Sequence, residues 1–305
     1  MTSSASPLAV PTGVPSARVR VSADLLGMLS SRLTDRDRWI ATLLFDHQVL
    51  TTAQIAQLGF DSEGAARHRL VILHRLRVAD RFRPQCPAGS APFHYVLDEM
   101  GAAVVAAARG VEPTELGFRR ERALALAHSP RLAHTVGVNG FFAALAGAAR
   151  RTPGAQLTEW WPERRCAAQW GTLVRPDGYG RWREPGPAGA MEVDFFVEYD
   201  RGSETTARVA AKLAGYAELT AATGIATPVL IWLPSPAREA PVRRQLGRPS
   251  VPVATAAPAS GTSPAEAVWL PAEHSGPRLR LVQLASYWER QGGAPRPTAR
   301  PAGKR

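Results

Sequence analysis

Lysine is almost absent from this chain of 305 residues: of its 37 Lys and Arg residues, only Lys212 and Lys304 are lysines. Cysteine is equally scarce. Cys86 and Cys166 lie far apart, which excludes a disulfide framework and a zinc site built from thiolates. The seven histidines show neither an HxH nor an HExxH spacing, so the common histidine metal motifs are missing as well.

Long apolar runs are also lacking. We find no apolar run of membrane length, and the first residues (MTSSASPLAVPTGVPSARVR) lack the basic and apolar regions of a secretory signal. We therefore expect a cytoplasmic protein with no membrane partner.

Positive charge is in excess, with a formal net charge of +11 and an isoelectric point near 10.8. Such a balance is typical of proteins that bind nucleic acid or another polyanion. The high Arg, Ala, Pro and Gly content is also typical of a GC-rich genome, so bulk charge alone is a weak indication.

Composition divides the chain into four parts. Residues 1–30 are rich in Ser, Pro and Ala, and residues 289–305 form a basic Pro/Gly-rich tail, so we expect disorder at both ends. Between them we expect a first domain over residues 31–112 and a second over residues 120–288.

The first domain reads as three short helices followed by a hairpin. Thr34 and Ser62 are candidate N-caps, and Thr51 and Gln54 have the spacing of a capping box. Two short strands around a Pro/Gly loop follow, and then a helix from about Glu99 to Arg109. This is the element order of a winged helix-turn-helix.

Basic residues are concentrated where that fold touches DNA. From Ser62 to Pro84 the chain holds six arginines against two acids. The predicted DNA-binding residues are Arg67, His68, Arg69, Arg75, Arg77, Arg81 and Arg83. The alternative is a solvated helix face with a hairpin used for protein contacts, as in some winged-helix homodimers.

The second domain begins with a mostly apolar helix around "LAHTVGVNGFF", in which His134 and Asn139 are polar exceptions that we interpret as satisfied core contacts. Candidate strands cover residues 156–165, 171–182 and 191–200. A helix from Thr205 or Thr206 to Gly224 and a strand Thr227–Leu233 complete the order. A helix between the third and fourth strands allows parallel pairing, so we expect an α/β domain with a mixed central sheet, beside the α+β first domain.

The third strand, "MEVDFFVEYD", carries four acids. Because side chains alternate in a strand, Glu192, Asp194, Glu198 and Asp200 share one face. Glu198 and Asp200 converge at its end, where two carboxylates repel unless a cation lies between them. Oxygen ligands favour Mg²⁺, and Asp177 in "RPDGYG" is a candidate third ligand if the two strands pair.

Lys212 follows on the next helix. In a chain that otherwise uses arginine, a compact ammonium is suited to orienting or deprotonating a water. Arg208, Lys212 and Tyr216 share a helix face by their spacing. The alternative is a surface lysine beside an exposed tyrosine.

Asp177 in "RPD" and Glu198-Tyr199-Asp200 on a strand, set in this element order, resemble the PD-(D/E)xK nuclease superfamily. The wider set "LAHTVGVN", "LVRPD", "FFVEYDRGSE" and "KLAGY" resembles the replication-relaxation family of actinobacterial and plasmid proteins, over roughly Leu33 to Leu233. The resemblance implies a nuclease-like core akin to plasmid-mobilisation relaxases. It implies that Asp177 and Glu198 bind metal, with the Tyr199 carbonyl as a backbone ligand. Where the superfamily motif has its lysine this chain has Asp200, and Lys212 would replace that lysine.

Two functions follow. The first is a DNA-binding protein of plasmid or mobile-element replication that nicks DNA with Mg²⁺ or Mn²⁺, using Asp177, Glu198, Asp200 and Lys212. The alternative is a non-catalytic regulator or replication accessory factor with a degenerate nuclease fold. The expected partners are DNA, a second copy of the chain, or replication and mobilisation proteins. Tyr199 or Tyr216 as a covalent nucleophile has no support from spacing.

Overall fold

The structure is a computed structural model and describes residues 27, 31–85, 89–186 and 189–291. The predicted disordered ends, residues 1–30 and 289–305, lie almost entirely outside these residues. The last helix ends at Arg290, so the first two residues of the predicted tail are helical.

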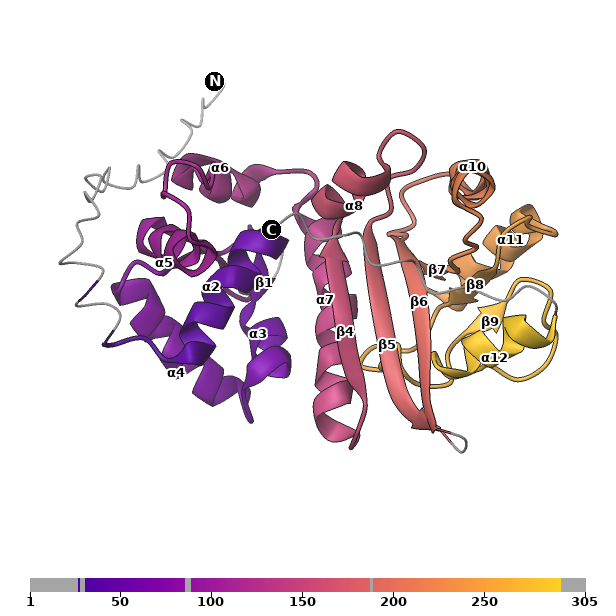
Figure 1. Cartoon of the computed structure of the whole chain (residues 1–305), viewed down its shortest axis with the longest axis horizontal. Coiled ribbons are helices and arrows are strands. Elements are labelled where there is room, and N and C mark those ends of the chain that lie inside the picture. Colours follow the sequence, from indigo (N-terminus) through magenta and orange to yellow (C-terminus); the bar gives the residue numbers. More distant parts are fainter. Residues whose placement is uncertain (1–26, 28–30, 86–88, 187–188, 292–305) are drawn as a thin grey trace, which may run out of the picture.

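The N-terminal part combines helices with a small antiparallel sheet (Figure 1). Its strands lie in the order β1-β3-β2. In chain order the elements are α2 (Asp35–His47), β1 (Leu50–Thr51), α3 (Thr52–Gly59), α4 (Glu63–Arg75), β2 (Ala79–Phe82), β3 (His94–Leu97) and α5 (Glu99–Arg109).

Side-chain caps set where these helices begin. The Thr34 backbone N–H donates to the Asp37 carboxylate at 2.7 Å, and the Asp37 N–H donates back to the Thr34 hydroxyl. Thr51 and Gln54 make the same reciprocal pair at the start of α3, and the Ser62 hydroxyl caps α4. Each cap satisfies a backbone donor that the first turn leaves unpaired. The three predicted N-caps are confirmed.

The C-terminal part is built on a sheet of strand order β4-β5-β6-β7-β8-β9. Strands β4, β5 and β6 pair antiparallel, β6, β7 and β8 pair parallel, and β9 is antiparallel to β8. Mixed pairing confirms the predicted α/β class with a mixed central sheet. The strands are β4 (Gln156–Pro162), β5 (Gly178–Gly186), β6 (Gly189–Tyr199), β7 (Val229–Trp232), β8 (Val253–Ala256) and β9 (Leu270–Pro271).

Helices connect and cover these strands. They are α6 (Arg120–Ala125), the 3₁₀ helix η1 (Leu126–His128), α7 (Leu132–Arg151), α8 (Glu163–Trp170), α9 (Thr206–Ala211), α10 (Leu213–Thr223), α11 (Pro236–Leu246) and α12 (Gln283–Arg290). Helices α7 and α12 pack on one face of the sheet, and α9, α10 and α11 pack on the other. The sheet therefore lies between two helical layers.

The alternation predicted for the acidic strand β6 is confirmed. Val193, Phe195 and Val197 face the core shared with α7 and α12. Phe196 faces the other core, with α9 and α10. Asp194, Glu198 and Asp200 therefore lie inside the protein and each needs a partner, whereas Glu192 is exposed.

Helix α7 is the longest helix in the described part of the chain and runs between the two sheets (Figure 1). By length and composition it meets the test for a membrane span, although the sequence was expected to hold no such segment. Half of its apolar window is buried, and Phe141, Phe142 and Leu145 pack against the large sheet. The helix therefore has the contacts of a core helix.

Three predicted elements differ from the structure in their extent. The predicted first strand, residues 156–165, stops at Pro162, where Glu163 begins the unpredicted helix α8. The second strand begins only at Gly178, so Asp177 precedes β5 instead of lying within a strand. The predicted single helix from Thr205 to Gly224 is broken at Lys212 into α9 and α10.

Polar contacts join the two parts through α7. The Asn139 side-chain amide donates to the backbone carbonyls of His47 and Val49 at 3.0 and 2.7 Å. The Gln54 amide donates to the carbonyl of Val136 at 2.7 Å. Arg150 near the end of the helix donates to carbonyls at the end of α3. Interpreting Asn139 as a satisfied core contact is thereby confirmed.

Candidate active site

The candidate site lies at the end of β6, where α7, the start of β5 and α9–α10 meet. Its centre is Glu198, a carboxylate only 5% exposed. The Lys212 ammonium donates to Glu198 Oε2 at 2.8 Å, and the Tyr216 hydroxyl donates to Oε1 at 2.5 Å. Lys212 and Tyr216 therefore share a helix face directed at Glu198. Arg208 pairs with Glu204 and is largely exposed.

The surroundings of Glu198 raise the pKa of its carboxyl group from 4.5 to about 7. Burial is the largest cause, and the negative charge of Asp177 is the second. The Lys212 charge and its hydrogen bond act in the opposite direction. A carboxyl group that titrates near neutrality is typical of sites that move protons or hold cations.

Asp177 is held immediately before β5. Its Oδ1 lies 2.9 Å from His134 Nε2, and its Oδ2 accepts the Tyr199 backbone N–H at 2.8 Å. The hydrogen bond to Asp177 raises the pKa of His134 against the opposing effect of burial. His134 is thus biased towards its protonated form, and it lies on α7, directly across from the sheet.

A second ring of charges surrounds these groups. Glu204 lies 3.3 Å from the Lys212 ammonium. Glu163 pairs with Arg131, and its negative charge helps to raise the pKa of His134. The Tyr199 ring packs on α7 where Gly137 leaves room, because a Cβ there would overlap the ring. This close approach brings His134 and the end of β6 together.

Three of the predicted catalytic residues, Asp177, Glu198 and Lys212, gather here, but Asp200 has different partners. Its Oδ2 accepts from Arg238 Nε at 2.7 Å, and its Oδ1 accepts the Gly202 N–H at 2.7 Å. The remaining acids of β6, Glu192 and Asp194, pair with Arg181. Asp200 therefore shares a strand face with Glu198 without sharing its contacts.

Both tyrosines near the site have a raised pKa. Burial is the main cause for each, and for Tyr216 the charge of Glu198 adds to it. Tyr216 is 1% exposed and uses its hydroxyl hydrogen for Glu198. It is therefore poorly placed to attack a phosphodiester, whereas Tyr199 is only partly buried.

The donor set suits a hard cation only in part. Among residues 27, 31–85, 89–186 and 189–291, no group of three or more His, Cys, Asp or Glu side chains is placed to hold a metal ion. The two carboxylates of Asp177 and Glu198 nevertheless interact, since the charge of Asp177 raises the pKa of Glu198. Mg²⁺ is commonly held by one or two carboxylates together with substrate phosphates, so a two-carboxylate site fits its chemistry.

Two of the predicted DNA-binding arginines hold the N-terminal part together. Arg69 donates to the buried carboxylate of Asp37, and its Nε–Oδ1 distance is 2.7 Å. Arg77 pairs with Asp98 and Glu99. Because their guanidinium groups are engaged with acids, these arginines are poorly placed to neutralise phosphates.

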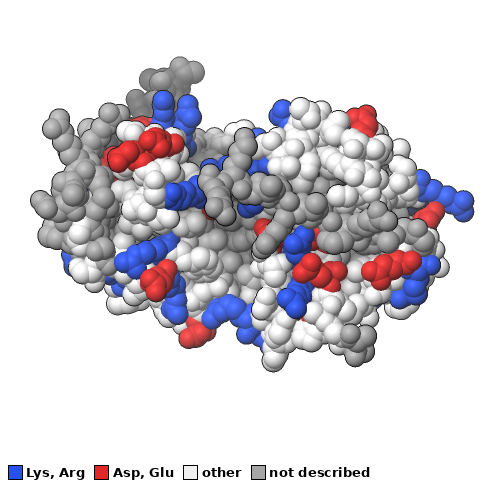
Figure 2. Space-filling view, in the orientation of Figure 1, with Lys and Arg blue, Asp and Glu red and all other residues white. Residues whose placement is uncertain are grey.

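The other predicted DNA-binding residues point outward. His68, Arg75 and Arg83 are exposed, Arg67 is exposed with a partner in Glu63, and Arg81 is half-buried. The guanidinium groups of Arg81 and Arg83 lie 4.2 and 3.8 Å from the centre of the Phe93 ring. On the face shown in Figure 2, acidic side chains lie beside several basic ones, so a phosphate-binding surface depends on the arginines that have no acidic partner.

His134 is the residue at this site that sequence reasoning missed as a functional group. It was interpreted as a core contact because it lies alone on an apolar helix. The segment "LAHTVGVN" contained the available signal, since it was part of the family resemblance. The link to Asp177, 43 positions later in the sequence, required the fold.

A family model described as Replication-relaxation matches residues 42–230 of the chain. The matched region includes His134, Asp177, Glu198 and Lys212. Among curated proteins and solved structures, no match to the chain was found.

Proposed function

Because the chain belongs to the replication-relaxation family, we propose that it is a DNA-binding protein of plasmid or mobile-element replication that nicks DNA with the help of Mg²⁺ or Mn²⁺. Its substrate would be DNA held by the N-terminal part and cut at the end of β6.

One observation carries the catalytic part of this proposal. Asp177, Glu198 and Lys212 come from three separate segments, yet they interact at one end of the sheet. Two acids and a lysine at the edge of a mixed sheet are the residue types of the PD-(D/E)xK nucleases. A purely structural ion pair would require only Glu198 and Lys212.

The N-terminal part supports DNA binding by its element order. Helices α3 and α4 followed by the β2–β3 hairpin have the element order of a winged helix-turn-helix. In that fold the second of the two helices enters the major groove and a hairpin contacts the backbone. Arg67, His68 and Arg75 on α4 and Arg81 and Arg83 at the hairpin would then supply the phosphate contacts.

The chain's own residues suggest how a phosphodiester would be cut. Asp177 and Glu198 would hold the cation, which when bound supplies charge stabilisation and a more acidic water. Lys212 would donate to a phosphate oxygen as negative charge develops there. His134, whose protonated form Asp177 favours, would donate a proton to the departing oxygen.

Supercoiled plasmid provides the test. Incubation with Mg²⁺ or Mn²⁺ should convert it to the open-circular form, and Asp177→Ala and Glu198→Ala should abolish this conversion. Glu192→Gln is the matched control, because Glu192 is an acid of the same strand face that pairs with Arg181 away from the site. Nicking that persists in both alanine variants would rule out this active site.

A non-catalytic DNA-binding protein is the second candidate, and the partners of the acids favour it. Both oxygens of Glu198 are engaged by Lys212 and Tyr216, and both oxygens of Asp177 are engaged by His134 and Tyr199. Such pairing would let the site persist as a set of structural contacts. This protein would bind DNA in a salt-dependent manner that EDTA does not change, and it would leave plasmid supercoiled.

A further inference from the structure

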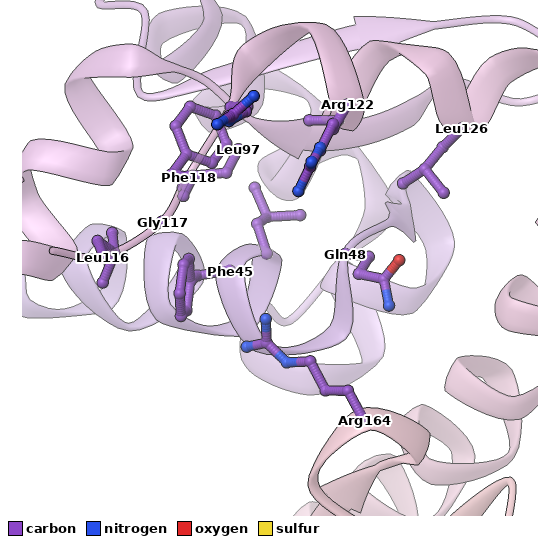
Figure 3. A pocket seen from close by; sticks show the side chains of 12 residues that line it. Phe45, Gln48, Leu97, Leu116, Gly117, Phe118, Arg122, Leu126 and Arg164 are labelled. Carbon is purple, nitrogen blue, oxygen red and sulfur yellow. The ribbon is translucent and has the colours of Figure 1, made fainter. Parts of the chain in front are cut away.

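A cavity lies away from the candidate active site, where the two parts of the chain meet. It has a volume of about 180 Å³ and is lined by residues of α2, β3, α6, the segment before α6, η1 and α8. Its apolar wall consists of Leu44, Phe45, Leu97, Leu116, Phe118 and Leu126. Figure 3 shows Phe45 and Phe118 at one side of it and Gln48 at the other.

Arginines supply the charge around this cavity. Arg122 from α6 and Arg164 from α8 project into it from opposite sides (Figure 3), and Arg119 also lines it. Arg119 and Arg122 are exposed and form no ion pair with any described residue, whereas Arg164 shares the carboxylate of Asp46 with Arg109. None of the described residues that line the cavity is acidic.

The size of the cavity limits what it can hold. A cavity of about 150 Å³ lined by apolar side chains accepts one benzene ring. The cavity here is of similar volume, so it accommodates one planar ring system with apolar faces. The Gln48 amide at its side provides a hydrogen-bond donor and an acceptor for the edge of such a ring.

The arginines specify the rest of the ligand. Guanidinium groups bind phosphate oxygens in pairs of hydrogen bonds, and exposed arginines without acidic partners keep that capacity. A ring in an apolar cavity with a phosphate at its arginine rim describes a nucleotide. We infer that this cavity binds one unpaired nucleotide, with its base among Phe45, Phe118 and Leu126 and its phosphate at Arg119 and Arg122.

The cavity and the candidate active site adjoin the same helix. Arg164 of α8 lines the cavity. Its neighbour Glu163 pairs with Arg131 and lies close enough to His134 for its negative charge to raise the pKa of that histidine. Helices α6, α8 and α10 lie along one edge of the molecule (Figure 1). If the proposed function holds, on which this point rests, a strand with an unpaired base in the cavity would continue along that edge towards Asp177 and Glu198.

Direct binding measured in EDTA tests the inference without reading catalysis. The probes are a short labelled oligo-dT strand, an abasic strand of the same length, and free dTMP as competitor. Because stacking a base on aromatic side chains contributes about 1–3 kcal/mol, the full chain should prefer the strand with bases by at least about fivefold. Displacement by dTMP would show that a free nucleotide suffices. Displacement only by strands would identify DNA as the source.

Two variants locate the effect. Ala123→Phe fills the cavity from α6 and should remove the preference for bases while binding to the abasic strand persists. Arg119→Ala with Arg122→Ala should weaken binding of both dTMP and oligo-dT at least tenfold, since charge-assisted hydrogen bonds contribute about 1.5–3 kcal/mol each. The matched control is Arg244→Ala with Arg248→Ala, two exposed arginines at and beyond the end of α11.

Equal affinity for the abasic strand and oligo-dT in the unmodified chain would overturn the inference. Unchanged affinity of the arginine double variant for both dTMP and oligo-dT would also overturn it, whether or not Ala123→Phe folds, because the double variant changes only exposed side chains. Neither result depends on nicking. The Asp177→Ala variant should lose the proposed nuclease activity and still bind oligo-dT and dTMP like the unmodified chain.

Discussion

The Lys212 ammonium lies 2.8 Å from Glu198 Oε2, although the two residues come from different elements and Glu198 is almost fully buried. Burial lowers the pKa of Lys212, but the charge and hydrogen bond of Glu198 outweigh this effect and raise it above its ordinary value. Lys212 therefore stays charged at neutral pH. It cannot act as a base there, and its role is that of a positive charge and hydrogen-bond donor.

Substituting Lys212 should separate its structural role from its catalytic role. Lys212→Ala leaves Glu198 without its cation and should lower the free energy of unfolding by about 1–3 kcal/mol, towards the lower end because Glu198 can take up a proton. Lys212→Arg keeps the charge and should restore much of this stability. Urea unfolding measures stability, and plasmid nicking measures activity. Full nicking by Lys212→Ala would exclude a catalytic lysine here.

Glu198 and His134 should make stability depend on pH near neutrality. The folded protein holds the Glu198 proton up to about pH 7, whereas the unfolded chain releases it near 4.5. The stability that the raised pKa of Glu198 contributes to the folded protein is therefore fully present below pH 4.5 and is lost as pH rises through 7. The raised pKa of His134 also stabilises the folded protein at low pH, and this stabilisation is lost as the pH rises above 6.5.

Unfolding curves collected across about pH 4 to 8 would measure this dependence. This range covers the ordinary pKa values of both a glutamate and a histidine side chain. Glu198→Gln should flatten the lower part of the profile, and His134→Gln should flatten only the part above 6.5. A profile for Glu198→Gln that runs parallel to the unmodified protein throughout would contradict the raised pKa.

Local sequence patterns predicted much of this fold. The caps at Thr34, Thr51 and Ser62 depend on residues three positions away, and the alternation in β6 depends on residues two apart, so a reader of the sequence can see both. Helix α8 and the break at Lys212 were missed because their sequences carry no strong stop signal. Likewise, no local pattern shows that Asp200 accepts a hydrogen bond from Arg238 while Glu198 accepts one from Lys212, because tertiary packing determines these partners.

Asp200 and Glu198 should therefore behave differently when they are neutralised. Asp200→Asn removes half of a buried ion pair with Arg238 and should mainly reduce stability. Glu198→Gln should remove nicking at a smaller loss of stability, because its surroundings already favour a proton. Thermal unfolding and plasmid nicking on both variants give the comparison. Loss of nicking in a stable Asp200→Asn protein would restore Asp200 as a metal ligand.

The arginines of the N-terminal part divide into two groups with different expected effects. Arg75→Ala removes an exposed charge on α4 and should weaken DNA binding at all sequences, lowering the salt dependence of the affinity by about one unit of slope. Arg69→Ala leaves the buried Asp37 without its cation and should lower the thermal midpoint instead. Titrations with duplex DNA at several salt concentrations distinguish them. An unchanged slope for Arg75→Ala would place the DNA elsewhere.

Asn139 should determine whether the two parts unfold together. Its amide donates to the carbonyls of His47 and Val49, so Asn139→Ala removes this donor from the Val49 carbonyl and leaves the His47 carbonyl with the Val49 N–H. We expect a loss of about 1–3 kcal/mol, concentrated at the junction between α7 and the N-terminal part. Hydrogen exchange should show faster opening of α2 and α3 than of β5 and β6. Thr135→Ala, a change on the exposed hydroxyl of the same helix, is the control. If hydrogen exchange in Asn139→Ala becomes faster by the same factor in all four elements, the two parts form one cooperative unit. In that case α7 joins them too tightly for either part to open alone.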